Sequence, residues 1–178
     1  MNAPVRIQTT RLILAPPTEA DVQDVFDRFA SDPDVTRYLG WPRHRSVDDT
    51  HGFVAWSVDH WARHPAGPYL IRARGDGRLL GSTGLTYDDE GGAMTGYVLA
   101  RDSWGQGYAT ESLRAMLDVA RAVALPRLHA FCHPDHRPSQ RVLEKCGFVR
   151  DESMVSQMIF PNLSPGVPQD TLCYVRWP

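Results

Sequence analysis

Two glycines, Gly105 and Gly107, lie between a predicted strand that ends at Leu99 and a predicted helix that begins at Tyr108. The first backbone N–H groups of a helix have no partner inside the helix, and they lie at the positive end of its dipole. Glycines allow such a turn to be tight and allow a bulky anion to approach the backbone. The pattern therefore predicts a binding site for a phosphate or pyrophosphate group.

Glycine pairs of this kind occur in several phosphate-binding folds, and two of these do not fit the surrounding residues. A P-loop requires a Lys after its last glycine, but Tyr108 follows Gly107. A dinucleotide-binding fold requires a third glycine and a parallel β-α-β unit. Here Thr110 occupies the third position, and the preceding strand belongs to a predicted antiparallel meander. A third kind of loop, with the pattern (Q/R)xxGx(G/A), fits the position between strand and helix.

Three segments share the order and approximate spacing of one enzyme family. The run Trp104–Glu111 resembles the motif WGxGYATE, and Pro134–Phe148 resembles the motif NxxSxRVLEKxGF. Thr10–Leu14, followed by a predicted helix, resembles the opening of the same proteins. On these residues the chain is similar to the GCN5-related N-acetyltransferase (GNAT) family, in its ribosomal-protein alanine acetyltransferase (RimJ/RimL-like) branch.

The resemblance implies an acyl-CoA-dependent N-acyltransferase. Such an enzyme moves an acetyl group from acetyl-CoA directly to a primary amine, either a protein N-terminus or a small-molecule amine. The cofactor contacts that it implies are Tyr97, Val98 and Leu99 from the strand, Trp104, Gly105, Gln106, Gly107, Tyr108, Ala109 and Thr110 from the loop, and His136, Ser139, Val142 and Leu143 from a later helix.

The chain departs from the family pattern at three positions that bear on binding and chemistry. Asp102 stands where Gln or Arg is usual, which leaves most of the phosphate binding to backbone amides. His136 replaces a usual Asn, and its imidazole can still form a hydrogen bond to a pantetheine carbonyl. Leu143 replaces the Tyr that acts as general acid in many relatives, so a tyrosine at that position cannot serve here.

Ser139 is the candidate catalytic group beside the leaving sulfur. A serine hydroxyl is a poor acid, so a hydrogen bond to the sulfur is the contribution we expect. Because Ser139 lies at the start of a predicted helix, a capping role is the alternative, and the two roles are compatible. The donor to the developing oxyanion is expected to be the backbone N–H of Val98 or Leu99.

Several residues could accept a proton from the attacking amine, and the sequence leaves the choice open. The candidates are Glu111, Glu90, His133 and His136. Glu111 lies in the first turn of its helix, where an acid also stabilises the helix dipole. An α-amine has a pKa of about 7.7–8.0, so much of it is neutral near pH 8 and a strong base is dispensable.

Aromatic and metal-binding residue types elsewhere in the chain have simpler interpretations. Trp41, in a Gly-Trp-Pro loop, is the candidate contact for the acceptor, whereas Trp56 and Trp61 are expected in the core. The cluster of His129, Cys132, His133 and His136 contains metal-ligand types. Because neighbouring positions in a strand point to opposite faces, these four side chains cannot easily converge, and no metal is expected.

Hydrophobic periodicity predicts the elements that position these residues. Helices are expected from Thr18, from Ser46, over Tyr108–Ala122 and over Pro138–Cys146, with an irregular aromatic loop over Val35–Arg45. The expected strands are Arg11–Leu14, Tyr69–Ile71, Leu79–Tyr87, Met94–Leu99, Leu128–Cys132, one from Phe148, and Leu172–Trp177. We therefore expect one α+β domain over residues 1–178 with a mixed sheet. The resemblance adds about four flanking helices and a sheet that splays between its fourth and fifth strands.

Composition sets limits on the partners and the compartment. The chain has 178 residues, of which 42% are hydrophobic and 22% charged, and a net charge of −2, so nothing indicates nucleic-acid binding. Its first residues lack the apolar core of a secretory signal, and no run approaches the roughly 20 apolar residues of a membrane helix. We expect a cytoplasmic monomer or homodimer. Without a CxxC pair, the three cysteines are expected to be buried and unpaired.

The sequence leaves a second class of function open. Because Leu143 and His136 depart from the family pattern, a CoA-binding sensor or structural module that lacks turnover is the alternative. Release of CoA in the presence of amines would distinguish the two.

Overall fold

The structure is a computed structural model that describes residues 2–154 and 156–178, and within them nine strands form an open mixed sheet. The sheet order is β1-β2-β3-β4-β5-β6-β9-β7, with β8 paired to β9. Strands β5 and β6 pair in parallel, and the other pairs are antiparallel. The strands are β1 (Ile7–Gln8), β2 (Leu12–Ala15), β3 (Tyr69–Ala73), β4 (Leu79–Tyr87), β5 (Ala93–Leu99), β6 (Leu128–Cys132), β7 (Val149–Arg150), β8 (Ser156–Ile159) and β9 (Pro168–Arg176).

Helices lie on both sides of this sheet. The α-helices are α1 (Val22–Val25), α2 (Pro33–Thr36), α3 (Val47–Arg63), α4 (Tyr108–Ala122) and α5 (Arg137–Lys145). Two 3-10 turns, η1 (Glu19–Asp21) and η3 (Arg101–Ser103), and a π-helical turn, η2 (Phe26–Ala30), complete them. The predicted single α+β domain with a mixed sheet is confirmed.

The predicted helix from Thr18 is broken into several short turns. Its segments are η1, α1 and η2, after which α2 begins within the region predicted as an irregular loop. Pro33 occupies the first turn of α2, and the Asp32 carboxylate accepts hydrogen bonds from the backbone N–H groups of Asp34 and Val35. This cap starts a new helix where the longer pattern ends, because proline is tolerated in a first turn. Farther along, β9 begins at Pro168 rather than at Leu172.

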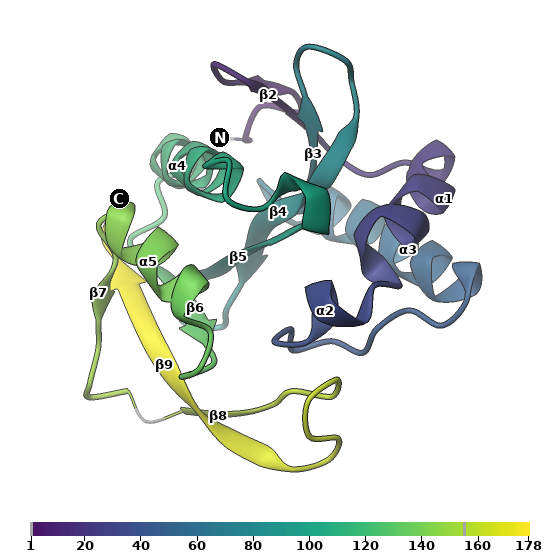
Figure 1. The fold of residues 1–178 in the computed structure, drawn as a ribbon. Coiled ribbons are helices and arrows are strands. Elements are labelled where there is room, and N and C mark those ends of the chain that lie inside the picture. The colour runs from purple at the N-terminus through teal and green to yellow at the C-terminus, as the bar shows by residue number, and fades with distance from the viewer. Residues whose placement is uncertain (1, 155) are drawn as a thin grey trace.

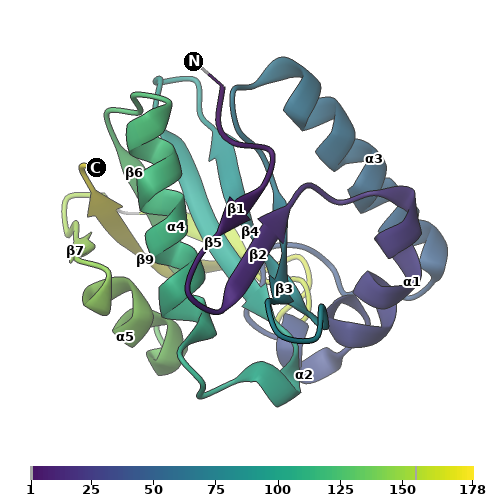
Figure 2. The same cartoon turned by 90° about the horizontal axis from the view of Figure 1, so that it is seen from above.

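Two hydrophobic clusters fill the space between the sheet and the helices on its two faces. Leu113 and Met116 of α4 pack with Leu12, Tyr69 and Leu128 of the sheet in the larger cluster. On the opposite face, residues of α1, η2 and α2 pack with Leu70 and Leu79 and form the smaller cluster, whose buried members also include Val25, Phe29, Ala30 and Val35. Figures 1 and 2 show the result, with α4 and α5 on one side of the molecule and α1, α2 and α3 on the other.

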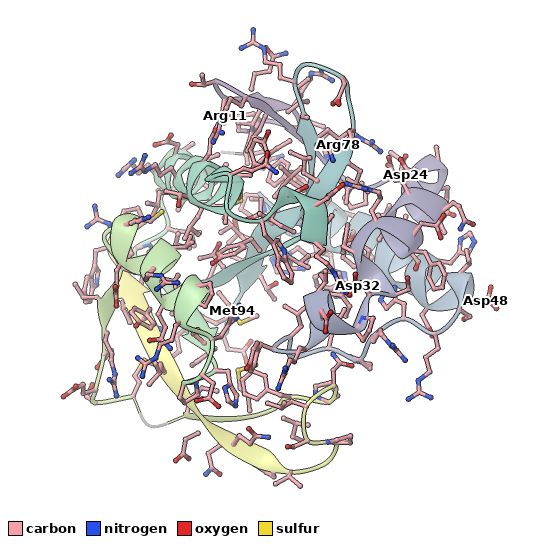
Figure 3. The ribbon with its side chains drawn as sticks, in the orientation of Figure 1. Arg11, Asp24, Asp32, Asp48, Arg78 and Met94 are labelled. Atoms are coloured by element: carbon pink, nitrogen blue, oxygen red, sulfur yellow. The ribbon has the colours of Figure 1, made fainter. Side chains whose placement is uncertain are left out.

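The two central parallel strands pair over a short stretch and then separate. Their ladder consists of Ala93 with Leu128 and Met94 with His129, although β5 continues to Leu99 and β6 to Cys132. The separation is visible between β5 and β6 in Figure 1, and Met94, where the pairing ends, is labelled in Figure 3. The splay predicted between the fourth and fifth expected strands, which are β5 and β6 here, is therefore confirmed. Beyond Met94, no described strand pairs with the β6-facing edge of β5.

Other expectations concern residues in the core. Cys132, Cys146 and Cys173 are buried free thiols, as predicted. Trp61 packs against the larger cluster, but Trp56 is 44% exposed on α3, so its predicted core position is wrong. Position 56 lies outside the buried face of α3, which consists of Thr50, Val54, Ser57 and His60. None of the helices in the described part of the chain combines the length and apolar character that crossing a membrane requires.

Candidate active site

The glycine loop before α4 presents a run of unpaired backbone amides. Gly105 has φ +73° and Gly107, the N-cap of α4, has φ +80°, a left-handed conformation that favours glycine. The Trp104 N–H donates to Arg101 and the Glu111 N–H donates to Gly107. Among the described residues, no hydrogen-bond acceptor contacts the backbone N–H group of any residue from 105 to 110. We call these six amides the anion cradle, because they lie at the positive end of α4.

The cradle is fastened to the end of β5 by Trp104. Its indole Nε1 donates to the carbonyl oxygen of Leu99 at 2.8 Å, and the Gln106 side-chain amide donates to the carbonyl of Asp102 at 2.7 Å. These bonds cross the turn between strand and helix. They hold Gly105 between two fixed points and so keep the cradle open.

The contacts of Asp102 give a reason for an acid at a position where the family pattern has Gln or Arg. Its carboxylate accepts hydrogen bonds from Arg28 and from Arg78, each at 2.8 Å, and from the Ser103 hydroxyl at 3.1 Å. Burial opposes ionisation, but these hydrogen bonds lower the pKa of Asp102. An acid at this position thus anchors the loop to η2 and to the β3–β4 turn.

Arg11 and Glu111 hold the first turn of α4 against β2. The Glu111 carboxylate accepts from Arg11 Nε at 2.7 Å, from the Arg11 backbone N–H at 2.8 Å and from the Thr9 hydroxyl. Arg11, which is labelled in Figure 3, also donates to the carbonyl of Gln106 at 2.8 Å and stacks over the ring of Tyr108. Burial opposes the change, but the bonds from Thr9 and Arg11 lower the pKa of Glu111. A carboxylate held in this way fits the structural role better than that of a base.

The direction of each backbone group along β5 follows from two hydrogen bonds. The Ala100 N–H donates to Leu80 on the β4 side, and the Ala93 N–H donates to Arg127 on the β6 side. Alternate residues of a strand direct their N–H and C=O groups to opposite edges. Even-numbered residues of β5 therefore face β4, and odd-numbered residues face β6.

This alternation distinguishes the two expected oxyanion donors. Val98 directs its N–H into the ladder with Ser82 of β4. Tyr97 and Leu99 direct theirs toward the open edge, beyond the last β5–β6 pair at Met94. The geometry thus favours Leu99 over Val98, and it adds Tyr97 to the free backbone donors.

Ser139 faces this open edge from α5. The Tyr97 phenol of β5 donates to Ser139 Oγ at 3.1 Å. The N-cap of α5 is His136, and Ser139 is the third helical residue, so it does not occupy the cap position. Leu143 is 3% exposed and lies in the core, whereas Val142 is only partly buried beside it. The structure therefore brings Tyr97 and Ser139 together from two elements that are distant in sequence.

A groove of about 710 Å³ runs along α4 next to the cradle. Gly107 and Thr110 form one end of it, and Arg114 and Lys145 line it. The carboxylates of Glu111 and Asp118 line the same groove, so its charge is mixed.

A family model for the acetyltransferase (GNAT) domain matches residues 11–149. The chain belongs to the GNAT acetyltransferase family. It is 28% identical over 171 residues to the uncharacterized N-acetyltransferase YoaA of Bacillus subtilis (strain 168), with 94% of each chain covered. Together these matches show an N-acetyltransferase.

Solved structures share the whole fold of this N-acetyltransferase. An acetyltransferase (GNAT family) from Bacillus anthracis has a TM-score of 0.81 at 26% identity and covers 97% of this chain and 98% of its own. The microcin self-immunity acetyltransferase MccE, in complex with acetyl-CoA and AMP, has a TM-score of 0.82 at 19% identity, with 98% and 97% covered. A ribosomal-protein-S5-alanine acetyltransferase from Vibrio fischeri has a TM-score of 0.79 at 14% identity, with 98% of this chain and 97% of its own chain covered. Ribosomal-protein acetyltransferases are thus one of several groups among the neighbours of this GNAT protein.

Aromatic and histidine rings pack together between the loop after α2 and the start of α5. Tyr38, after α2, stacks on His136 with ring centroids 4.8 Å apart and lies 5.0 Å from His133. Burial and the neighbouring His133 lower the pKa of His136, which favours a neutral imidazole. The His133 ring contacts Gln169 through Nε2 and packs edge-on against Phe160. Across residues 2–154 and 156–178, no three His, Cys, Asp or Glu side chains converge as metal ligands.

Asn162, from the segment between β8 and β9, fastens the loop that carries Trp41. Its amide donates to the carbonyls of Thr36 and Trp41 at 2.8 and 2.9 Å, and its carbonyl accepts from the Arg43 N–H at 2.7 Å. Trp41 packs against the smaller hydrophobic cluster and lies 5.3 Å from the His44 ring. The loop is therefore held in place by a residue more than one hundred positions away.

Sequence reasoning missed Tyr97 as a side chain, Arg11, Tyr38 and Asn162. For Tyr97 a signal existed, because strand alternation places its ring on the side of α4 and α5 and that of Val98 on the opposite side. For Arg11 the signal was weaker, since an exposed arginine before a strand has many partners. Tyr38 and Asn162 carry no local signal, because their partners lie in segments far along the chain.

Proposed function

We propose that this GNAT enzyme moves an acetyl group from acetyl-CoA directly to a primary amine. The observation that carries the proposal is the open edge of β5 that leads directly to the anion cradle. A CoA molecule has a pyrophosphate that suits the cradle and an amide-rich arm that suits unpaired backbone groups. MccE, which shares this fold, was solved in complex with acetyl-CoA, and this supports acetyl-CoA as the donor here.

The proposed cofactor contacts follow this path. The pyrophosphate lies on the amides of residues 105–110, between Trp104 and the first turn of α4. The arm follows Leu99 and Tyr97 on one side and Val142, Ser139 and His136 on the other, and Leu143 supports the wall from the core. Arg114 and Lys145 offset further negative charge of the nucleotide.

The chemical step requires little from the protein beyond position and hydrogen bonds. The nitrogen of a neutral amine forms a bond to the acyl carbon, and the free N–H of Leu99 or Tyr97 donates to the carbonyl oxygen as charge develops. The C–S bond then breaks, and the proton from nitrogen ends on the CoA sulfur. Ser139 lies where a hydroxyl can donate a hydrogen bond to that sulfur.

For the acceptor, we propose entry on the side of Trp41 and Tyr38. The ring pair Tyr38–His136 joins the α2–α3 loop to the start of α5, and the hydrogen bonds of Asn162 join the same loop to the β8–β9 segment. A protein N-terminus and a small amine both contain a primary amine, which is the group this mechanism requires.

The test combines purified protein, acetyl-CoA and a panel of amines that includes dipeptides, polyamines and amino acids. Formation of free thiol together with an acetylated amine of the expected mass would support the proposal. Tight CoA binding without release against every amine would favour the sensor alternative instead. Absence of CoA binding would contradict both the acetyltransferase proposal and the sensor alternative.

A further inference from the structure

The backbone and the side chain of Tyr97 face different parts of the proposed cofactor site. Its backbone groups face the open edge of β5, while its ring lies with the larger hydrophobic cluster, on the α5 side. The hydroxyl at the end of that ring donates to Ser139 Oγ at 3.1 Å. One strand residue thus contributes both an edge amide and a hydroxyl that reaches across the splay to α5.

Ser139 is arranged to pass on this hydrogen bond. Because His136 occupies the cap of α5, the Ser139 hydroxyl is not used to cap the helix, and its oxygen accepts a hydrogen bond from the Tyr97 hydroxyl. A hydroxyl that accepts a hydrogen bond becomes a better donor through its own proton.

From this geometry we propose that Tyr97 is a positioning residue that holds and polarises Ser139, so that Ser139 donates a stronger hydrogen bond to the leaving CoA sulfur. The inference rests on the proposed acetyl transfer. No proton leaves either side chain: the C–S electron pair moves to sulfur, the Ser139 O–H solvates the charge, and the proton from the amine completes the thiol. The pair thereby takes the place of the tyrosine that is missing at Leu143.

Burial explains why the phenol can serve across the physiological range. It raises the pKa of Tyr97, and the hydrogen bond to Ser139 only partly offsets this rise. The phenol therefore remains protonated and keeps its donor. Tyr97 cannot act as a full acid toward a thiolate for the same reason, which is why a relayed hydrogen bond is the role proposed.

The experiment is a double-mutant cycle with Tyr97→Phe, Ser139→Ala and both together. We expect Tyr97→Phe to lower kcat about tenfold, with the KM for acetyl-CoA changed less than about twofold, as one lost hydrogen bond in the transition state implies. In the Ser139→Ala background the same change should have no further effect. Ser139→Thr, which keeps the hydroxyl, should restore most of the rate. Tyr174→Phe, which removes the phenol that donates to Glu144 on another part of α5, is the matched control and should leave kcat unchanged.

A second measurement does not depend on turnover. In the binary complex with CoA, the thiolate is followed by ultraviolet absorbance as the pH rises. The pKa of the bound thiol should be lower in the wild type than in Tyr97→Phe, by about one unit for a tenfold effect. Equal thiol pKa values, equal losses in both backgrounds of the cycle, or a rise in KM alone would overturn the role of Tyr97. Lack of acetyl transfer by a wild type that still lowers the thiol pKa would overturn the proposed function and leave the relay supported.

Discussion

Trp104 donates its indole N–H to the carbonyl of Leu99 at 2.8 Å, and this bond joins the open edge of β5 to the anion cradle. The two parts of the proposed cofactor site therefore share a fixed geometry. A bond at this point aligns the last free amides of the strand with the first free amides of α4. Affinity for CoA should depend on it even though the Trp104 ring is 48% exposed.

We predict that Trp104→Phe weakens CoA binding about fivefold, since one hydrogen bond contributes about 1 kcal/mol. Isothermal titration calorimetry measures this directly. Trp56→Phe, at a similarly exposed ring on α3, is the control and should bind CoA as the wild type does. Equal affinities of Trp104→Phe and wild type would show that the loop holds its shape without the indole.

Gly107→Ala should weaken CoA binding by more than tenfold. The residue has φ +80°, so an added Cβ strains the backbone that presents the cradle amides, and it would also stand between those amides and an approaching anion. The matched control is Gly91→Ala, which has φ +81° and nothing within 4 Å of the added carbon, in a turn remote from the site. Each change should cost about 1–2 kcal/mol of stability from the left-handed backbone. If both variants lost CoA affinity equally, the loss would reflect stability and not the cradle.

Glu111→Gln should lower stability and leave most of the catalytic rate. Loss of the charged acceptor for Arg11 and Thr9 should cost about 1–2 kcal/mol, because Arg11 is half exposed and solvent screens the pair. That cost corresponds to a fall in Tm of about 2–8 °C. Below its melting temperature the variant should keep kcat within about threefold. A loss of several hundredfold would identify Glu111 as the base after all.

The same variant has a defined pH dependence. The folded pKa of Glu111 lies below its reference value of 4.5. Its contribution is therefore fully present above the unfolded pKa and is lost as the pH falls through the folded pKa. Urea denaturation should show the full difference between wild type and variant at pH 7 and a shrinking difference below about pH 4.5. Glu152→Gln, at an exposed position, is the control and should show no such difference.

Asn162→Asp should affect the acceptor and spare acetyl-CoA. The change keeps an acceptor for the Arg43 N–H but removes both donors to Thr36 and Trp41. The freed loop should raise the KM for the amine about tenfold, while the KM for acetyl-CoA stays within about twofold. Steady-state kinetics with each substrate varied in turn separate the two. A rise in the KM for acetyl-CoA alone would contradict the proposal that the Trp41 loop contacts the acceptor.

Local patterns were enough to predict much of this molecule. The predicted bounds of the helix over Tyr108–Ala122 and the strand over Leu128–Cys132 agree with the structure, because repeated apolar positions and flanking glycines act within a few residues. The antiparallel meander before the glycine loop was also predictable from its turns. Thr18 caps the first turn together with Asp21, as expected, but the segment that follows changes from a 3-10 turn through α1 to a π-helical turn, which the apolar spacing did not indicate.

The sequence by itself determined the anion cradle, because left-handed glycines and unpaired amides are properties of one short segment. It also indicated the splay, through motifs whose family has that fold. Only the tertiary structure decided that Glu111 is held by Arg11, that Leu99 and Tyr97 and not Val98 face the opening, and that Tyr97 reaches Ser139. These are contacts between segments tens of residues apart, and their partners are chosen by packing and strand register, which no local pattern encodes.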